Sequence, residues 1–502
     1  MSEGLSHALL VGWLEAPFAV AFLGAVVPIL GDLPLLLCCI ATGGIALQTL
    51  LSDSTTTLML LGNHGVVLQL DPLAAWFLLL NAVVMVAVRL ELRGNSERPA
   101  PLLPAVLLGG LNICFVVSDL ISLYVALELV GIVAFLLILR DGSPQRLWIG
   151  LRYLLISNTA MTLYLVGAAL AYAITGSFRF SSLSGLPIGA AQVLLLLGLF
   201  TKGGLFLPGL WLPRSHAEAP SDVSALLSAV VVTAGVAPLL RLAAIEPALL
   251  PLVRSIGLCS AVLGVLQALN AADLKRLLAW STVSQMGLVV LSPAAGGALA
   301  LTHGLAKAPL FLTAGRIRER QLEGWEQRVL PQSVQTPLWL GSLSIAGLPG
   351  LAGFAAKKLV GSDLPPAWAL SLTLIGIGSV AVYARLWSPA PAPSSAPTPG
   401  IPPGTALLLI SLVGAGLILT VVSAAEANGL QANDLLTSVL QTGVVFAAGW
   451  LLHRLLGRDH NSHRRSLARR MPQLESLQDL LGAITVVGAG MLLALNLLEV
   501  PG

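Results

Sequence analysis

The chain has 502 residues, of which 56% are hydrophobic and only 10% are charged, and its formal net charge is +3. Soluble domains carry about 25% charged residues, so this composition excludes a soluble catalytic enzyme. The apolar runs are continuous and do not alternate with polar residues, which predicts membrane-spanning helices and not a β-barrel. We therefore expect an all-α, polytopic membrane protein.

Apolar runs close to the roughly 20 residues that a helix needs to cross a bilayer recur along the whole chain. One helical bundle of about sixteen spans, within a range of about 14 to 16, thus accounts for nearly all of the sequence. The predicted spans are residues 11–30, 34–51, 71–90, 101–118, 120–139, 148–174, 189–210, 222–243, 250–270, 276–292, 296–315, 335–361, 367–387, 404–424, 434–455 and 479–498.

The charged residues between these spans predict how the chain crosses the membrane. Loops after odd-numbered spans carry most of the basic residues: Arg93, Arg98, Arg140, Arg146, Lys275, Arg276, Arg316, Arg318, Arg320, Arg328 and a final group from Arg454 to Arg470. The loops after even-numbered spans are assigned mainly acidic residues, namely Asp32, Asp53, Asp71, Asp119, Asp363, Glu426 and Asp434. The basic residues assigned to these loops are Arg179, Arg241 and Arg254. The positive-inside rule then predicts that the odd-numbered loops are cytoplasmic and that both termini face the opposite side.

Several features favour simple structural interpretations. The Pro/Ser/Ala-rich stretch 388–403 is typical of a stiff surface linker, and the basic run RDHNSHRRSLARRMPQ before the last span favours an anchor at anionic lipid over a specific partner site. The four cysteines, Cys38, Cys39, Cys114 and Cys259, lie in apolar runs without CxxC spacing and are interpreted as small core residues. We therefore expect no metal or cofactor site in this chain.

Glu128 is an acid inside a predicted span. It lies in the run SDLISLYVALELVGIVAFLLIL, whose other acid, Asp119, is at the edge. At a rise of 1.5 Å per residue, Glu128 is about 13 Å deeper, near the middle of the bilayer. A carboxylate at that depth must be protonated or paired, so Glu128 is either a structural hydrogen-bonding group or part of a proton path.

Two lysines lie in apolar stretches beside glycine-rich breaks. Lys202 precedes Gly203, Gly204 and Pro208, and Lys357 follows Gly347, Pro349, Gly350 and Gly353. A lysine at mid-bilayer depth costs about 2.5 to 3.5 kcal/mol, and broken helices in two halves of a chain point to a transport site. Lys202 could instead snorkel from a helix end. Of the adjacent Lys357 and Lys358, we expect Lys357 to be the buried one.

Two further pairs carry titratable groups. His303 and Lys307, in LTHGLAKAPLFLTAG, are four residues apart and share one helix face, as either a structural pair or the middle of a water-linked relay. His216 and Glu218, in WLPRSHAEAPSDVSALL, occupy the junction between the seventh and eighth spans. A structural or proton-access role is favoured there over a metal site, because no second ligand cluster has metal spacing.

These residues lie in motifs that resemble the antiporter-like subunits shared by respiratory complex I, membrane hydrogenases and Mrp-type sodium/proton antiporters. WLPRSHAEAPSDVSALL resembles the family segment WLPDAHxEAPTPVSALL, SDLISLYVALEL resembles DLxxFYxFWEL, and DLKRLLAWSTVSQMG resembles DLKRLLAYSSISHMG. HGLAKAPLFLTAG resembles HAxFKAxLFLxAG, and GLPGLAGFAAK resembles GLPPxxGFxxK. The resemblance covers roughly residues 70–390.

The resemblance implies a fold of two inverted five-helix repeats with broken helices, at 101–243 and 250–387, preceded by N-terminal spans in 1–100 and followed by C-terminal spans in 404–502. It implies that Glu128 is the charge-pair glutamate, that Lys202 and Lys357 are the broken-helix lysines, and that Lys307 is the central lysine. Thr233 and Gln285 stand where the family often has a lysine and a histidine. Neither residue carries charge, so the first half has fewer titratable groups than the family pattern.

The resulting hypothesis is a proton-translocating subunit of a larger membrane complex, with the D-type subunit of an Mrp-like cation/proton antiporter favoured. Alternatives are the equivalent subunit of an NAD(P)H or ferredoxin quinone oxidoreductase and a scaffold subunit that does not conduct. The expected partners are other membrane subunits, protons with Na⁺ or K⁺, and lipid, but no nucleic acid. The expected location is the inner membrane of a prokaryotic cell or the thylakoid membrane.

Overall fold

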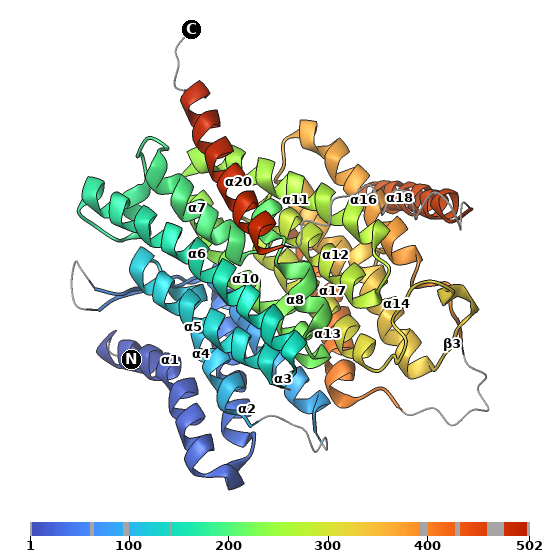
Figure 1. Cartoon of the computed structure of the whole chain (residues 1–502), viewed down its shortest axis with the longest axis horizontal. Coiled ribbons are helices and arrows are strands. Elements are labelled where there is room, and N and C mark those ends of the chain that lie inside the picture. The colour runs from blue at the N-terminus through green and yellow to red at the C-terminus, as the bar shows by residue number, and fades with distance from the viewer. Residues whose placement is uncertain are drawn as a thin grey trace.

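A computed structural model describes residues 3–60, 65–93, 100–140, 142–391, 400–426, 432–458 and 476–498. Most of the predicted linker and the basic run that follows Arg458 lie outside these residues. The described chain is a bundle of helices (Figure 1), which confirms the predicted class. Two small two-stranded sheets lie in loops and were not predicted: β1 (Thr56–Met59) pairs antiparallel with β2 (Val67–Leu70), and β3 (Val329–Leu330) pairs parallel with β4 (Ala390–Pro391).

Each predicted span coincides with one or more helices. Twelve helical stretches of the described residues are long and apolar enough to cross a membrane, and Leu102–Val116 is a shorter apolar helix. The helices are α1 (Glu3–Val26), α2 (Leu33–Ser52), α3 (Pro72–Glu91), α4 (Leu102–Val116), α5 (Leu120–Leu139), α6 (Pro144–Thr175), α7 (Ala190–Lys202), α8 (Leu212–Glu218), α9 (Ser221–Leu226), α10 (Thr233–Ile245), α11 (Leu250–Asn270), α12 (Leu274–Val289), α13 (Gly296–Gly315), α14 (Gln332–Ala346), α15 (Ala352–Ser362), α16 (Ala369–Ala384), α17 (Pro403–Glu426), α18 (Ala432–Arg458) and α20 (Leu477–Leu498).

The two halves of the bundle follow one packing order. In the first half, α4 packs on α5, α5 on α6 and α6 on α7, and α10 returns to α4. In the second half, α11 packs on α12, α12 on α13 and α13 on both α14 and α15, and α16 returns to α11. In the predicted topology α4 and α11 begin on opposite sides, as two inverted repeats require.

Helix α13 lies at the centre of the molecule. It packs against α3, α9, α12, α14, α15 and α17, and every residue from Gly296 through Ala314 is buried. An all-round buried helix cannot snorkel its polar groups to water, so His303 and Lys307 must be accommodated inside the protein.

Both halves contain a helix that is broken within the membrane. α7 ends at Lys202, and Gly204 then adopts φ +63°, after which a 3₁₀ turn, η4 (Leu207–Gly209), leads to α8. α14 ends before Gly347, which has φ +94°, and Gly350 has φ +88° before α15 begins. Left-handed backbone favours glycine, so these residues let the chain leave the helical path.

Ion pairs join the loops that were predicted to share the acid-rich side. Arg241 at the end of α10 donates two hydrogen bonds to Asp71, at 2.6 and 3.0 Å, across 170 residues of sequence. Arg254 of α11 lies 3.8 Å from Asp363, which follows α15. Arg241 and Arg254, two of the basic residues that departed from the acid-rich pattern, thus pair with acidic residues of the same side.

On the other side, Arg140 at the end of α5 pairs with Asp222 of α9 at 2.5 Å. Arg89 in the last turn of α3 pairs with Asp32, which lies between α1 and α2. The assignment of Asp32 to the acid-rich side was therefore wrong, because the loop after the first span lies on the same side as the end of the third. Cys259 also differs from expectation, because it is exposed on α11, whereas the other three cysteines are buried.

The last helices pack on different halves. α18 lies against α16, and the ring of Trp387, which follows α16, stacks with both Phe446 and Trp450 at centroid distances of 6.1 and 6.2 Å. α20 packs on α6, α7 and η4, next to the first helix break. Figure 1 shows these two helices at well-separated places on the bundle.

Candidate functional site

Glu128 and Lys202 form an ion pair inside the first half. The Lys202 Nζ lies 3.7 Å from Glu128 Oε1 and donates a 3.0 Å hydrogen bond to the carbonyl oxygen of Leu127. The lysine side chain is 7% exposed and the glutamate side chain is 21% exposed. Lys202 is the last residue of α7, where the helix dipole favours a positive charge.

A glycine on α5 makes room for this lysine. A Cβ atom added at Gly131 would lie 2.8 Å from the Lys202 Nζ, 3.4 Å from the Ser157 hydroxyl and 3.9 Å from the Tyr153 hydroxyl. The ammonium therefore lies directly against the α5 backbone, with two α6 hydroxyl groups beside it. Gly131, Ser157 and Tyr153 were not predicted from the sequence. Ser157 and Tyr153 lie on α6 and become neighbours of Lys202 only through helix packing.

The carboxylate of Glu128 has a second neighbour on α6. The Asn158 amide, with its nitrogen facing Glu128, donates a 3.2 Å hydrogen bond to Oε2. The other carboxylate oxygen, Oε1, is buried and accepts no hydrogen bond from the described residues. Glu128 thus has one carboxylate oxygen that accepts a hydrogen bond and one that faces the Lys202 ammonium.

The break after Lys202 is stabilised by a tryptophan from the next helix segment. The Trp211 indole donates a 2.7 Å hydrogen bond to the Thr201 carbonyl, and the Leu205 amide bonds to the Phe200 carbonyl at 2.9 Å. These bonds help to pair the carbonyl groups at the end of α7, where the regular helical partners are missing.

His216 is completely buried in α8, although its position at a junction predicted a loop. Its ring lies 6.0 Å from the Trp211 ring and 6.2 Å from the Phe311 ring. Neither ring nitrogen forms a hydrogen bond of normal geometry with a described residue. The imidazole is within electrostatic range of both Lys275 and Lys307.

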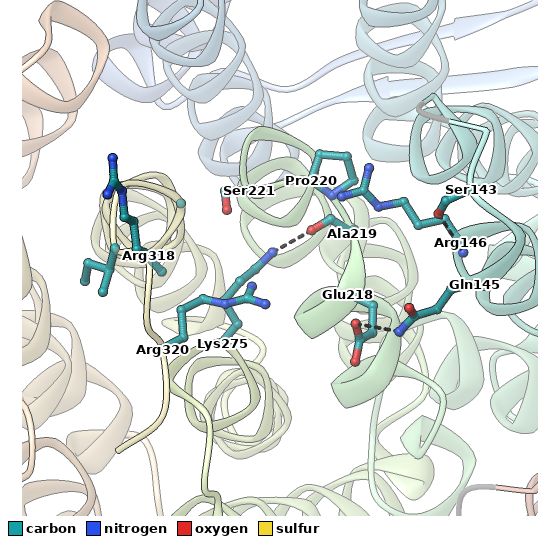
Figure 2. Close-up of a pocket in the computed structure, with 13 residues that line it drawn as sticks. Ser143, Gln145, Arg146, Glu218, Ala219, Pro220, Ser221, Lys275, Arg318 and Arg320 are labelled. Atoms are coloured by element: carbon teal, nitrogen blue, oxygen red, sulfur yellow. Dashed lines mark hydrogen bonds between the residues drawn. The ribbon is translucent and has the colours of Figure 1, made fainter. Parts of the chain in front are cut away.

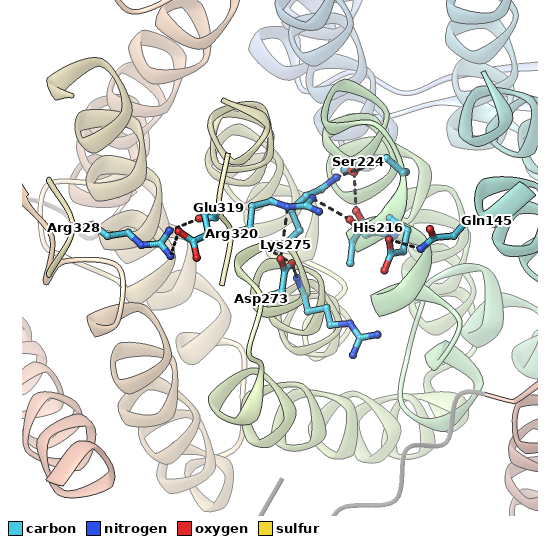
Figure 3. Close-up of polar contacts among 12 residues, drawn as sticks. Gln145, His216, Ser224, Asp273, Lys275, Glu319, Arg320 and Arg328 are labelled. Carbon is cyan, nitrogen blue, oxygen red and sulfur yellow. Dashed lines mark hydrogen bonds and ion pairs between the residues drawn. The ribbon is translucent and has the colours of Figure 1, made fainter. Parts of the chain in front are cut away.

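Glu218 points away from His216 and toward the surface. It accepts a 3.2 Å hydrogen bond from the Gln145 amide and lines a pocket of about 590 Å³ (Figure 2). Figure 3 shows Lys275 and the α8 segment around His216 next to each other. The two residues predicted as one possible access site are therefore separate: Glu218 lies at the mouth and His216 lies in the interior.

The central pair lies on α13, as the four-residue spacing predicts. The Lys307 Nζ donates a 2.6 Å hydrogen bond to the Leu278 carbonyl and a second bond to the Ser281 hydroxyl, both on α12. The Tyr383 hydroxyl donates to the same serine at 2.8 Å, and the lysine lies 5.6 Å from the tyrosine ring centroid. Lys307 thus contacts α12 and α16, and each contact is uncharged.

His303 lies in the same buried region. It is 2% exposed, and its ring nitrogens form no hydrogen bond of normal geometry with a described residue. It interacts electrostatically with Lys307, His216 and Lys357. These three groups lie on α13, α8 and α15.

Lys357 lies at that second break. Its Nζ donates a 2.5 Å hydrogen bond to the Ile345 carbonyl near the end of α14, and the side chain borders a cavity of about 70 Å³. Lys358 is exposed, whereas Lys357 is partly buried. The lysines of the two halves are not equivalent in position, because Lys202 precedes its break and Lys357 follows its own.

The two residues that depart from the family pattern are also buried. The Thr233 hydroxyl donates a 2.7 Å hydrogen bond to the Val230 carbonyl, beside a π-helical turn, η5 (Leu227–Val231). Gln285 of α12 is 2% exposed. No group of three His, Cys, Asp or Glu side chains within the described ranges could hold a metal ion.

Comparison with known proteins identifies the family. The model of the transmembrane family "NADH:quinone oxidoreductase/Mrp antiporter" matches residues 117–382, which include all seven candidate residues and more than half of the chain. The chain belongs to this family. The segment of this chain that matches the family model begins just before α5 and ends within α16.

Two relatives come from different branches of the family. The D-type subunit of the Na⁺/H⁺ antiporter of Alkalihalophilus pseudofirmus is 27% identical over 310 residues, covering 56% of this chain and 62% of that protein. The NADH-quinone oxidoreductase subunit N of Desulforudis audaxviator is 31% identical over 356 residues, covering 62% of this chain and 69% of that protein. The chain spans about half to two thirds of the length of the curated relatives it matches.

A solved structure shares the fold. A chain in the structure of the Mrp complex from Dietzia sp. DQ12-45-1b aligns with a TM-score of 0.69 at 20% identity and covers 92% of this chain and 99% of that chain. The similarity establishes the arrangement of helices, and the antiporter-like class predicted from the motifs is confirmed by the family match.

Proposed function

We propose that this chain is a proton-translocating, antiporter-like subunit of a multisubunit membrane complex, with the D-type subunit of an Mrp cation/proton antiporter favoured. The observation that carries the proposal is the Glu128–Lys202 ion pair, buried at the end of a broken helix, with Nζ 3.7 Å from Oε1. A buried ion pair gains little stability relative to well-packed apolar residues, so a role beyond stability is supported.

In the proposed mechanism, the ion pair controls how firmly Lys202 holds its proton. While Oε1 stays close, its negative charge favours the ammonium form. When the pair opens, burial alone acts on the lysine, favours the neutral amine and drives the proton off Nζ. Closing the pair restores the ammonium form and resets the first half.

The released proton then passes through the buried cationic groups of the second half. His303 and Lys307 on α13 accept and donate it in the centre, and Lys357 is the last group, beside its cavity of about 70 Å³. Water is the proposed link between these groups, because their nitrogens bond to carbonyls, to a serine hydroxyl or to no described residue, and not directly to one another. At the opposite end of this path, the proton is proposed to enter through the pocket at Glu218 and then to pass through His216.

The second candidate is the equivalent subunit of an NAD(P)H or ferredoxin quinone oxidoreductase. The 31% identity to subunit N over 69% of that protein's length favours it as strongly as the other relative favours the antiporter. The polypeptides that copurify with this chain distinguish the two: Mrp-type membrane subunits support the antiporter, and redox subunits with nucleotide or quinone sites support the oxidoreductase. Either host implies other membrane subunits as partners.

The host membrane and the transported ion are also proposals. The inner membrane of a prokaryotic cell, or a thylakoid membrane, fits a family whose named relatives are bacterial and chloroplast proteins. Protons exchanged against Na⁺ or K⁺ fit the antiporter assignment.

The decisive experiment replaces Lys202 or Glu128 with Ala in the assembled complex and measures cation-dependent proton exchange in vesicles. We expect exchange to fall at least tenfold in each variant, while Lys358→Ala, which removes an exposed lysine, leaves it unchanged. Copurification of the other subunits is measured in parallel. Unchanged exchange in Lys202→Ala with intact assembly would refute the proposal and favour a scaffold that does not conduct.

A further inference from the structure

A pocket opens at the junction between the two halves, where two helices begin and two others end. Its volume is about 590 Å³, and its lining comes from the start of α6, the end of α8, the start of α12 and the segment that follows α13. Most of these residues belong to loops that were predicted to face the cytoplasm. The pocket is open to the surface, so a solute or lipid headgroup can reach it.

The lining has a large excess of positive charge. It contains Arg146, Lys275, Arg318 and Arg320 but a single acid, Glu218. Figure 2 shows Arg146 reaching in from the α6 side of Ala219, and Lys275 and Arg320 reaching in from the opposite side. Cations that converge on one hollow attract an anion, because each is destabilised by its neighbours.

Lys275 makes the charge excess hard to explain without a ligand. The residue is 1% exposed, and its ammonium donates a 2.5 Å hydrogen bond to the Ala219 carbonyl at the pocket wall. It forms no ion pair with any carboxylate of the described residues. The nearby Asp273 is already shared with Arg320, at 3.6 Å. A buried ammonium with only a carbonyl partner is costly, and a bound anion would offset that cost.

The start of α6 adds a second attraction for an anion. This helix has 32 residues, begins at Pro144 and is capped by Ser143, whose hydroxyl accepts from the Arg146 amide at 3.3 Å. Ser143, Gln145 and Arg146 all line the pocket. The positive end of a long helix dipole therefore faces the same hollow as the four cations.

We propose that this pocket binds a phosphate group, carried either by a soluble phosphate compound or by an anionic lipid headgroup. Arginine forks match phosphate oxygens with paired hydrogen bonds, and three of the four cations are arginines. The volume of about 590 Å³ exceeds that of phosphate alone and leaves room for the group that carries it. A bound phosphate would cover Glu218 and Lys275, so its occupancy would also limit access to His216.

The test measures binding and does not depend on transport, so it can fail or succeed independently of the proposed function. The purified complex in detergent with a neutral lipid is titrated with inorganic pyrophosphate by calorimetry at constant ionic strength. A second arm adds phosphatidylglycerol to phosphatidylcholine nanodiscs and counts retained lipids by native mass spectrometry. The variants are Arg146→Gln with Arg318→Gln, and Arg318→Gln alone, and the control is Lys358→Gln.

We expect saturable binding of one ligand class, weakened about tenfold for each arginine removed and unchanged in the control, as charge-assisted hydrogen bonds predict. Pyrophosphate binding with no specific lipid retention identifies a soluble ligand, and the reverse identifies a lipid. Arg318 is exposed, so its single variant keeps the test valid if the double variant does not assemble. No saturable binding in either arm, or binding that survives both variants, would overturn the proposal, and a carboxylate from a neighbouring subunit would then be the expected occupant.

Discussion

Replacing Gly131 with Ala is expected to disturb the Glu128–Lys202 pair without disturbing the fold. The new methyl group would lie 2.8 Å from the Lys202 Nζ, whereas ordinary contacts of this kind fall at 3.4–4 Å. The ammonium must therefore retreat from α5 by about 1 Å, the difference between these two distances. The retreat is easy because the atom that moves is the end of a flexible side chain.

The size of the effect follows from the geometry. With an effective dielectric constant of about 20, charges 3.7 Å apart attract by about 4.5 kcal/mol, and an extra 1 Å reduces this to about 3.5 kcal/mol. A loss of about 1 kcal/mol changes the balance between the closed and open pair about fivefold. Stability should change less than transport, because alanine gains about 1 kcal/mol of helix propensity while the lysine weakens one charged hydrogen bond worth about 1.5 to 3 kcal/mol.

The assay is cation-driven proton exchange in inverted vesicles that contain the assembled complex, normalised to the amount of this subunit. We expect Gly131→Ala to lower the exchange rate about fivefold, with the thermal midpoint of the complex close to that of the unmodified protein. Gly44→Ala on α2 is the matched control, since a Cβ there meets nothing within 4 Å. If Gly131→Ala and Gly44→Ala both exchange at the unmodified rate, the pair geometry does not control transport and the reasoning is refuted.

Three further outcomes are expected. Lys357→Gln should abolish proton exchange in vesicles, whereas Lys358→Gln, on the exposed neighbour, should not. Equal effects of the two substitutions would contradict the assignment of Lys357 to the proton path. Arg241→Gln should destabilise the protein by about 3 to 5 kcal/mol, because it leaves Asp71 as an uncompensated, largely buried charge. Adding Asp71→Asn should restore part of the lost stability in thermal melting. His216→Phe keeps an aromatic ring of similar volume, so melting should change by less than about 1.5 kcal/mol while exchange falls; unchanged exchange would remove His216 from the path.

Much of the fold was predictable because the bilayer limits the choices. Each apolar run of about 20 residues must pair its own backbone groups, so a helix forms wherever such a run occurs. Gly204 and Gly347 adopt left-handed backbone conformations within otherwise apolar segments, and the breaks predicted from glycine and proline lie there. The family resemblance also implied that Glu128 belongs to a charge pair and that Lys202 lies at a helix break.

The contacts of the site were less predictable because they join distant parts of the chain. His216 was placed at the junction between two spans, yet it lies in α8 and is buried beside two aromatic rings. Tyr383 meets Ser281 across 102 residues, and that contact completes the surroundings of Lys307. Residue spacing reports only neighbours within one helix, so it could not reveal either environment.

The sequence by itself determined that this is a multi-helix membrane protein with rare internal charges, since hydrophobicity and helix length are local properties of each segment. Only the tertiary structure decided which charges meet. It placed the Lys202 ammonium against the α5 backbone at Gly131, and it gathered four cations around one surface pocket. Both results depend on how the helices pack, and packing is a property of facing surfaces that no single segment encodes.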